Sequence, residues 1–369
     1  MRSDGIKVAL ISTGLGRILR GFESFTESLF KSLRAYAPNI DIALFQGGEG
    51  QGERRVVVPN FHRHDIPARW LGDEKGNLLE KRSFSLALYP FLRKGKFDIV
   101  HYNELVMGST LFHLRRIFGG VFKLLYCNGA PAPPSLYHDR CDYAQLLHGP
   151  MFEEARSFGM KPDKLFLLPY GVNSDRFSPE VKSFRNAIRQ ELGIPQEGKV
   201  ILTAAALNRW HKRVDYVIQE VARLPGFFWL MAAGQRMEET PSLEEEAKNL
   251  IPGRFRILSW PQEKMHLLYG AADIFTLASL HEGFGLATIE AMASGIPVII
   301  HNGPEFRWVA GDSNVMCIDM TKDGELASAV KDISSRQFIS NGRESAVSRF
   351  SWGSLVPQYL EMYQKIARC

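Results

Sequence analysis

One pattern occurs twice in this chain: apolar runs rich in β-forming residues alternate with stretches of helical periodicity through both halves. The first cycle predicts a buried strand at residues 6–12 (IKVALIS), a glycine-containing turn at 13–21, and a helix whose apolar face recurs along 22–33. This order is typical of parallel sheets with helices on both faces. We therefore predict an α/β protein with two Rossmann-like, doubly wound domains.

The sequence predicts five strands in each half, with a linker between the halves. The first-half strands are residues 6–12, 41–45, 98–102, 121–127 and 165–168, and the second-half strands are 199–207, 227–233, 254–260, 273–279 and 296–301. Proline, glycine and charged residues between Pro169 and Pro195 indicate the linker. We expect a first domain over residues 1–180 and a second over 181–350.

Length and composition agree with a two-domain, water-soluble enzyme. The chain has 369 residues, of which 45% are hydrophobic and 23% are charged. Its apolar runs fall far short of the ~20 residues that cross a bilayer, and the N-terminus lacks the long apolar segment of a secretory signal. The four cysteines show no metal-binding or disulfide framework. We expect a cytoplasmic protein with reduced thiols.

The net charge of +5 lies in the first half of the chain. Residues 1–175 contain 23 Lys and Arg against 18 Asp and Glu, and the remainder contains 22 of each. This excess is compatible with an anionic substrate or an anionic membrane surface. Because there is no compact basic block, an ordinary solvated surface is the simpler interpretation.

The segment LHEGFGLATIEAMASGIPVII, after the predicted strand at 273–279, carries the most specific chemistry. Gly283 and Gly285 stand before a helix that starts near Leu286, so a phosphate could approach free backbone N–H groups where the helix dipole favours negative charge. Glu282 and Glu290 could accept hydrogen bonds from sugar hydroxyls. Together these features describe a nucleotide-sugar site. A helix cap at Glu282 and a solvated Glu290 would be the structural alternative, but the small residues around Glu290 indicate close packing.

The same segment resembles the signature of the retaining family 4 glycosyltransferases of GT-B fold, whose two glutamates are spaced as Glu282 and Glu290 are. Further segments agree in order along nearly the whole chain: RGFES at 20–24, LLPYGVNSDRFSP at 167–179, HKRVDYVI at 211–218 and WPQEKMHLLYGAAD before the signature. The resemblance implies two domains facing across a cleft, with the donor bound mainly by the second domain and the acceptor by the first. It also implies that the final helix, in residues 351–369, crosses back to the first domain.

The resemblance assigns donor contacts to second-domain residues. Lys212 matches a lysine that pairs with the donor diphosphate. The family's arginine partner would fall at Leu207, so Arg209 is the candidate substitute. Glu282 would hold donor-sugar hydroxyls and Glu290 the ribose diol, with N–H groups from the 283–286 backbone (Gly283, Phe284, Gly285 and Leu286) and the base near Ser259 to Pro261, including Trp260. A solvated basic turn is the alternative interpretation for Arg209 and Lys212.

In the first domain, the resemblance points to a glycine loop and a histidine. Gly14 and Gly16 match a loop near the donor phosphates, although such loops follow the first strand of many unrelated α/β domains. The family's His-x-His segment is represented by His101-Tyr102-Asn103, so His101 is the candidate for a catalytic contact. A structural histidine is an equally good interpretation of this position.

Several competing motifs fail. Residues 193–199 (GIPQEGK) have Walker A spacing but precede a strand and lack the Ser/Thr, so we expect a turn there. The glycines at 14, 16 and 21 miss the dinucleotide spacing. No Asp-x-Asp pair occurs, so a metal-bridged diphosphate is not predicted, and no interleaving of aromatic and basic residues suggests nucleic acid.

These observations predict a retaining glycosyltransferase that uses a nucleoside-diphosphate sugar and needs no metal cofactor. The acceptor would be a saccharide, a glycolipid or another hydroxyl compound, as in glycan or polysaccharide synthesis, and the basic first domain is compatible with peripheral association with the cytoplasmic membrane face. The alternatives are a nucleotide-sugar 2-epimerase of GT-B architecture and a non-catalytic nucleotide-sugar-binding partner. The complete signature favours the transferase, and the presence of Lys212, Glu282 and Glu290 argues against an inactive copy.

Overall fold

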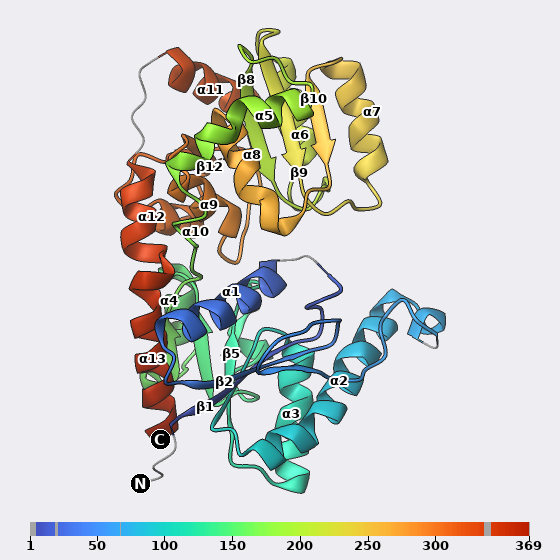
Figure 1. The fold of residues 1–369 in the computed structure, drawn as a ribbon, viewed down its shortest axis with the longest axis vertical. Coiled ribbons are helices and arrows are strands. Elements are labelled where there is room, and N and C mark those ends of the chain that lie inside the picture. The colour runs from blue at the N-terminus through green and yellow to red at the C-terminus, as the bar shows by residue number, and fades with distance from the viewer. Residues whose placement is uncertain (1–4, 19–20, 67, 336–340, 369) are drawn as a thin grey trace. The chain divides into compact units, whose positions relative to one another are not determined.

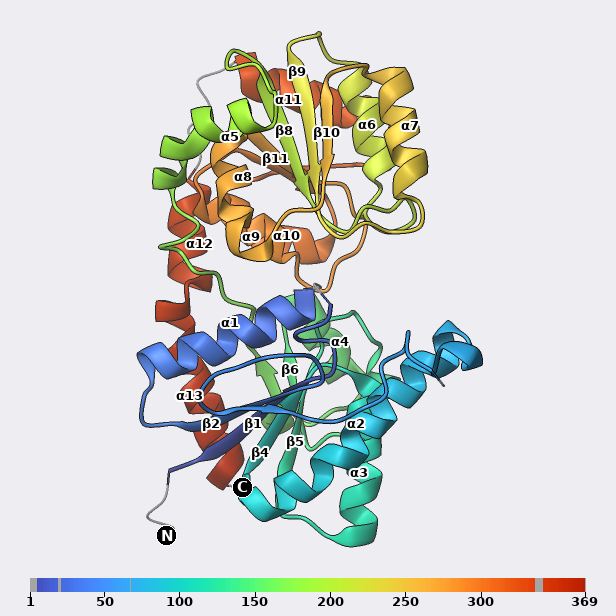
Figure 2. The same cartoon turned by 45° about the vertical axis from the view of Figure 1, so that its right-hand side comes forward.

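The computed structural model describes residues 5–18, 21–66, 68–335 and 341–368. These residues form two compact units: unit 1 is Met1–Gly171 with Leu355–Cys369, and unit 2 is Val172–Ser354. Each unit is a parallel sheet between helices (Figures 1 and 2). The arrangement is the doubly wound α/β architecture that the alternating pattern predicts.

Unit 1 contains a seven-stranded, all-parallel sheet with the strand order β3-β2-β1-β4-β5-β6-β7. Its strands are β1 (Lys7–Ser12), β2 (Asp41–Gln46), β3 (Arg55–Val57), β4 (Ile99–Tyr102), β5 (Lys123–Cys127), β6 (Tyr143–Leu146) and β7 (Leu165–Leu167). The central strands are buried on both faces, which explains their continuous apolar runs.

The helices of unit 1 cover both faces of this sheet. They are α1 (Gly21–Tyr36), α2 (Asp73–Gly95), α3 (Leu105–Phe118), α4 (Gly149–Ser157) and α13 (Trp352–Arg368), with short 3₁₀ turns η1 (Ala68–Leu71), η2 (Pro134–Leu136) and η3 (Pro162–Lys164). One apolar core joins α2, α3 and α4 to alternate residues of the strands, among them Val100 and Tyr102 of β4. The intervening residue His101 points to the other face, where it contacts Tyr363 of α13.

Helix α13 begins in unit 2 and continues into unit 1, where buried tyrosines attach it to the sheet. Tyr359 Oη accepts a hydrogen bond from Gln145 Nε2 of β6 at 2.8 Å and donates one to the carbonyl of Pro169 at 3.0 Å. Tyr363 Oη lies 2.9 Å from His101 Nδ1. The last helix of the chain is therefore an integral part of the first unit's core.

Unit 2 contains a six-stranded, all-parallel sheet with the strand order β10-β9-β8-β11-β12-β13. Its strands are β8 (Lys199–Ala204), β9 (Phe228–Ala233), β10 (Phe255–Leu258), β11 (Ile274–Leu277), β12 (Val298–His301) and β13 (Met316–Ile318). This is the 3-2-1-4-5-6 order of a dinucleotide-type Rossmann sheet.

The helices of unit 2 are α5 (Arg185–Glu191), α6 (Val214–Ala222), α7 (Thr240–Leu250), α8 (Met265–Ala271), α9 (Leu286–Ala293), α10 (Pro304–Ala310), α11 (Glu325–Ser335) and α12 (Gly342–Phe350), with 3₁₀ turns η4 (Pro179–Phe184) and η5 (Gln262–Lys264). One core packs α6, α7 and α11 on one face of the sheet. Helix α8 connects β10 to β11, and α9 connects β11 to β12. These two helices cover the other face of the sheet (Figure 2).

The strand predictions are confirmed, but both sheets are larger than expected. Each predicted strand is present, and β3, β6 and β13 are additional. Strands β3 and β13 are three-residue edge strands, too short to produce a recognisable run. Strand β6 contains the polar Gln145, which interrupts its apolar pattern.

The two units meet in sequence between Gly171 and Val172, earlier than the expected boundary after residue 180. Arg189 of α5 is completely buried, and it donates to the carbonyls of Ala271 and Gly198. Its guanidinium also pairs with Asp273 at 2.7 Å. The second part of the expected linker is therefore anchored inside unit 2. Residues 193–198 form the expected turn, and Lys199 begins β8.

No helix in the described part of the chain is long and apolar enough to cross a membrane.

Candidate functional site

The sheet of unit 2 has one topological switch point, between the adjacent strands β8 and β11. From β8 the chain adds strands β9 and β10 on one side, and then β11, β12 and β13 on the other. Ligands of open α/β sheets bind outside the carboxyl ends of the strands at such a switch point. The loops that follow these two strands are residues 205–213 and 278–285. They contain Arg209, Lys212, Glu282 and the glycines of the predicted site.

The structure brings Lys212 and Glu282 together across the switch point. Lys212 Nζ and a carboxylate oxygen of Glu282 form a hydrogen-bonded ion pair, with side-chain exposures of 17% and 10%. The buried Asn208 shapes the lysine's loop, because its Oδ1 accepts hydrogen bonds from the N–H groups of His211 (3.2 Å) and Lys212 (2.8 Å). One cation and one carboxylate are thus held at the end of the central strands.

Glu305 on α10 supports the loop that carries Glu282. Its Oε1 accepts a hydrogen bond from the Glu282 N–H at 3.4 Å and lies 3.5 Å from His281 Nδ1. His211 Nε2 lies 3.1 Å from the carbonyl of His281, which ties the lysine loop to the glutamate loop. The two loops therefore form one connected polar structure.

Helix α9 begins at Leu286, where the sequence predicts a helix start after the glycine segment. Gly285 is the N-cap of α9 and has φ 79°, a left-handed conformation that favours glycine. Phe284 is buried, and its ring packs edge-on against Phe350 with centroids 5.5 Å apart. Because the ring points into the core, Phe284 can offer a ligand only its backbone, as Gly283, Gly285 and Leu286 can.

Glu290 lies one turn into α9, and its carboxylate is held by Tyr269 of α8. Tyr269 Oη donates a 2.8 Å hydrogen bond to Glu290 Oε2 and also lies 3.3 Å from the carbonyl of Ala287. Burial raises the pKa of Glu290 to about 7, against a smaller opposing effect of the tyrosine hydrogen bond. Glu290 is therefore a packed carboxyl group, and the solvated-helix alternative does not describe it.

Arg209 shares the loop of Lys212, but its guanidinium points to α7. Its Nη1 pairs with Glu246 Oε2 at 2.5 Å and lies 3.8 Å from Asp215 Oδ2, and its backbone N–H donates to Glu239. The structure thus does not bring Arg209 to the Lys212–Glu282 pair.

The neighbouring Arg213 is also engaged in unit 2. It donates to the Met320 carbonyl at 2.7 Å and stacks 4.5 Å over the Tyr216 ring. Lys212 is therefore the member of this basic turn whose charge is directed to the switch point.

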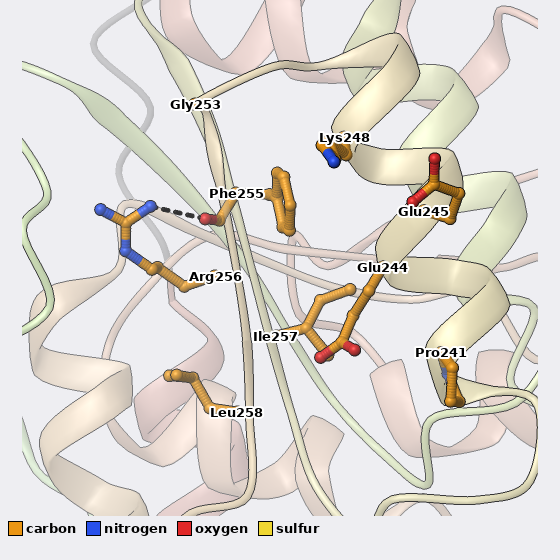
Figure 3. A pocket seen from close by; sticks show the side chains of 9 residues that line it. All are labelled: Pro241, Glu244, Glu245, Lys248, Gly253, Phe255, Arg256, Ile257 and Leu258. Carbon is orange, nitrogen blue, oxygen red and sulfur yellow. Dashed lines mark hydrogen bonds between the residues drawn. The ribbon is translucent and has the colours of Figure 1, made fainter.

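Trp260 lies in the loop after β10, on the far side of β9 from the switch point. Its Nε1 donates to the carbonyl of Lys264 at 3.0 Å and closes the turn formed by η5. A hollow of about 620 Å³ between α7 and β10 lies on the same part of unit 2 (Figure 3). It is lined by Pro241, Glu244, Glu245, Lys248, Gly253, Phe255, Arg256, Ile257 and Leu258, none of which is a predicted site residue.

In unit 1, Gly14 and Gly16 follow β1 as predicted. The Gly14 carbonyl accepts from Arg17 and Ile18, and Gly16 has φ 85° and packs against the backbone of Gly48 and Glu49, where a Cβ would collide. This close approach requires glycine at residue 16. Arg20 of the RGFES segment lies outside the described residues.

His101 is buried between α1 and α13. It contacts Tyr363 through Nδ1 and lies edge-on to the Phe25 ring, with centroids 6.3 Å apart. Desolvation lowers its pKa to about 3, so the ring is neutral at physiological pH. These contacts link His101 to α13 and agree with the structural interpretation of this residue.

A second polar cluster lies at the carboxyl ends of β1 and β4 in unit 1. Thr13 Oγ1 donates to Glu104 Oε2 at 2.5 Å, and Lys81 Nζ pairs with Glu104 Oε1 at 3.1 Å. This cluster occupies the switch point of the first sheet, the counterpart of the Lys212–Glu282 pair.

Sequence reasoning missed five polar residues of these two sites: Lys81, Glu104, Asn208, Tyr269 and Glu305. Glu104 lies two residues after a predicted strand, so its position was a usable signal. Asn208 bonds to N–H groups of its own loop, but the partners of Lys81, Tyr269 and Glu305 are more than 20 residues away, which local spacing does not encode.

Within the described residues, no three His, Cys, Asp or Glu side chains are grouped so that they could hold a metal ion.

Comparison with protein families gives a match over most of unit 2. Residues 184–346 match the family model described as glycosyl transferases group 1. These residues include both loops of the switch point and all of α9.

Curated relatives extend the similarity. The chain is 29% identical to D-inositol 3-phosphate glycosyltransferase of Xylanimonas cellulosilytica over 58% of its own length and 54% of the relative, and 28% identical to mannosylfructose-phosphate synthase of Agrobacterium fabrum over 56% and 49%. The match thus spans about half the length of these relatives. Against D-inositol 3-phosphate glycosyltransferase of Mycolicibacterium smegmatis the identity is 29% over 98% of this chain and 86% of the relative.

Solved structures share the fold of the whole chain. Sucrose-phosphate synthase from Thermosynechococcus elongatus matches with a TM-score of 0.81 at 18% identity, covering 98% of this chain and 99% of that one. The Anabaena protein Alr3699/HepE, solved in complex with UDP-glucose, matches with a TM-score of 0.78 at 16% identity, covering 97% and 99%.

Proposed function

We propose that this chain is a retaining glycosyltransferase, because residues 184–346 match the family model of glycosyl transferases group 1 and the chain has the GT-B fold. The donor is a nucleoside-diphosphate sugar, and the acceptor is a hydroxyl group of a saccharide, a glycolipid or another compound. The observation that carries the proposal is the Lys212–Glu282 pair at the switch point, beside the glycine-flanked N-terminus of α9.

The positive groups of this site suit a diphosphate. Lys212 supplies a compact cation, and the 283–286 backbone leads into a helix N-terminus, which favours negative charge. In the structure the lysine charge is balanced by Glu282. We propose that the diphosphate replaces Glu282 as the partner of Lys212 and leaves this carboxylate available to donor-sugar hydroxyls.

The role proposed for Glu290 is to accept hydrogen bonds from the ribose diol. Its carboxyl group is half-buried and fixed by Tyr269, and an ionised acceptor makes strong hydrogen bonds. The base then lies toward β10, near Trp260, because β9 and β10 extend the sheet on that side.

The reaction breaks the bond between the sugar C1 and the diphosphate oxygen and forms a bond from C1 to the acceptor oxygen. The transition state is oxocarbenium-like, and negative charge grows on the diphosphate as its bond breaks. Lys212 and the α9 N-terminus stabilise this charge, which is preorganised electrostatic catalysis. The acceptor hydroxyl gives up its proton to the departing phosphate or to water.

Arg209 would join the diphosphate only after it releases Glu246. Because its guanidinium is paired with Glu246 of α7, we assign Lys212 the larger part of the diphosphate charge. His101 is assigned to fixing α13 in unit 1. The acceptor side of the reaction belongs to unit 1, which is also the part proposed to associate with the cytoplasmic membrane face.

The proposal is tested by thermal stabilisation of the purified chain with a panel of nucleotide sugars, and then by nucleoside-diphosphate release with the donor that stabilises best. Lys212→Ala should bind this donor but release nucleoside diphosphate far more slowly. Lys199→Ala removes an exposed lysine at the opposite end of β8 and serves as the matched control. If no nucleotide sugar stabilises the chain, the proposal is wrong.

Two outcomes would favour the alternatives. Conversion of the donor to its 2-epimer without transfer would identify an epimerase, and donor binding without turnover in the presence of any acceptor would identify a binding partner.

A further inference from the structure

We infer that unit 1 docks on an anionic lipid surface through a patch made of Arg93, Lys94, Arg116, Ile117, Phe118 and Val121. The inference specifies the membrane association proposed above, but it rests on an observation that does not involve the donor site. The patch lies where the C-terminal ends of α2 and α3 come together, next to each other in both views (Figures 1 and 2).

The cationic part of the patch has no acidic residues in its two segments. Residues 81–97 and 105–138 contain no Asp or Glu at all. Arg93 and Lys94 end α2, Arg116 is in the last turn of α3, and all three are exposed. Within the described part of the chain, none of the three forms an ion pair, unlike Arg115, whose side chain is bound to Asp142.

Cations at helix C-terminal ends have an ordinary explanation, because they complement the helix dipole. That explanation does not account for the apolar side chains beside them. Ile117 is 71% exposed, Phe118 57% and Val121 73%. Three large apolar residues with such exposure, adjacent in the chain and flanked by unpaired cations, are unusual on a solvated surface.

The apolar residues are held in place by the fold. Tyr89 Oη donates to the carbonyl of Gly119, and the buried Phe122 packs against Tyr89 with ring centroids 6.2 Å apart. Gly119 has φ 75°, which turns the chain so that Phe118 and Val121 lie on either side of a two-glycine bend. Phe118 also lines a hollow of about 460 Å³ together with Tyr89, Pro90, Arg93 and Lys94.

The combination identifies the partner. Exposed apolar side chains that enter the headgroup region, surrounded by cations that attract acidic lipids, are the two elements of peripheral membrane binding. A nucleic acid would use the cations but leave Ile117 and Val121 in water. The patch also lies at the amino-end edge of the sheet, where β4 and β5 begin, whereas Thr13 and Glu104 lie at the carboxyl-end edge. Docking there leaves the ligand-binding edge free.

The test is co-sedimentation of the full chain with vesicles of phosphatidylcholine containing phosphatidylglycerol, and with vesicles of phosphatidylcholine alone. We expect binding to the anionic vesicles only. The triple variant Arg93→Gln, Lys94→Gln, Arg116→Gln should bind them about 100-fold more weakly, at roughly fivefold for each lost cation. The double variant Ile117→Ser, Val121→Ser should lose roughly tenfold for each side chain.

Two control variants distinguish binding through the patch from a general effect of surface charge or of exposed aromatic side chains. Lys161→Gln, Lys164→Gln, Lys331→Gln removes the same charge from exposed positions outside the patch, and Trp70→Ala removes a 77% exposed aromatic in η1, before the amino-terminal end of α2. Both should bind vesicles like the wild type. Equal losses in the patch triple and the control triple would overturn the inference, as would loss in Trp70→Ala or wild-type chain that stays in the supernatant.

Sedimentation velocity without lipid separates a protein partner from a lipid partner. A wild-type dimer that becomes monomeric in Ile117→Ser, Val121→Ser would assign the patch to a second copy of the chain and refute lipid docking. Donor binding by the patch variants should equal that of the wild type. Vesicle binding and donor binding can therefore fail independently, which keeps this inference distinguishable from the proposed transferase activity.

Discussion

Replacing Glu290 by Gln should make the chain's stability less dependent on pH. Burial raises the pKa of Glu290 from 4.5 to about 7, so the folded chain holds this proton more tightly than the unfolded chain. The resulting stabilisation is complete below pH 4.5 and is lost as the pH rises through 7. Each unit of difference between the folded and unfolded pKa values is worth ~1.4 kcal/mol, so the full stabilisation is about 3 kcal/mol.

The assay is urea unfolding of wild type and Glu290→Gln at pH 5 and pH 8. The wild type should lose about 2 to 3 kcal/mol more than the variant between these pH values, because glutamine keeps the Tyr269 hydrogen bond but cannot ionise. Parallel pH dependence of the two proteins would refute the reasoning, since Glu290 would then titrate as it does in water.

The same residue should control donor affinity. Glu290→Ala removes an acceptor of two charge-assisted hydrogen bonds, which at roughly 1.5 to 3 kcal/mol predicts binding about 10- to 150-fold weaker by calorimetry. Wild-type affinity should also increase as Glu290 ionises between pH 6 and 8, and Glu290→Gln should lack this increase. Unchanged affinity in a folded Glu290→Ala would assign Glu290 a purely structural role.

Three further predictions concern the diphosphate and the first unit. Lys212→Ala should lower kcat about 100-fold with a smaller change in donor Kd, because the diphosphate charge grows in the transition state, and equal kcat with weaker binding would contradict this. Donor hydrolysis in excess EDTA should retain most of the activity measured with magnesium, since Lys212 and the α9 N-terminus already supply positive charge, and complete loss restored by a divalent ion would contradict it. Tyr363→Phe should lower the free energy of unfolding by about 1 kcal/mol through the lost His101 contact and leave donor affinity unchanged, a result to be measured by urea unfolding and calorimetry.

The sequence predicts the central strands and the switch-point loops because each is a local feature. A largely buried strand such as β8, with four apolar residues among its six, is visible in a short window, and Lys212 and Glu282 lie in the loops that follow two such strands. Their contact follows from the strand order, since β8 and β11 are neighbours although 70 residues separate the two side chains. The strand order itself is not encoded in a local pattern.

The side-chain partners of the predicted residues could not be read from the sequence, because they depend on tertiary packing. Arg209 has the side-chain chemistry of a phosphate ligand, but its guanidinium forms an ion pair with Glu246 of α7. Only the packing of α7 beside the loop reveals this pair. The partner of His101 is equally hidden from local sequence, because Tyr363 comes from a helix 262 residues further along the chain. Tyr269 fixes Glu290 only because α8 lies against α9.

The most direct test of the proposed chemistry follows donor hydrolysis by proton NMR, without an acceptor, using the nucleoside-diphosphate α-sugar that stabilises the chain best. The wild type should release nucleoside diphosphate and the α-anomer first, with the β-anomer appearing only at the slower rate of mutarotation. Lys212→Ala should release both products about 100-fold more slowly. If the β-anomer appears first, or if Lys212→Ala hydrolyses the donor as fast as the wild type does, the proposal of a retaining transferase centred on the Lys212–Glu282 switch point is wrong.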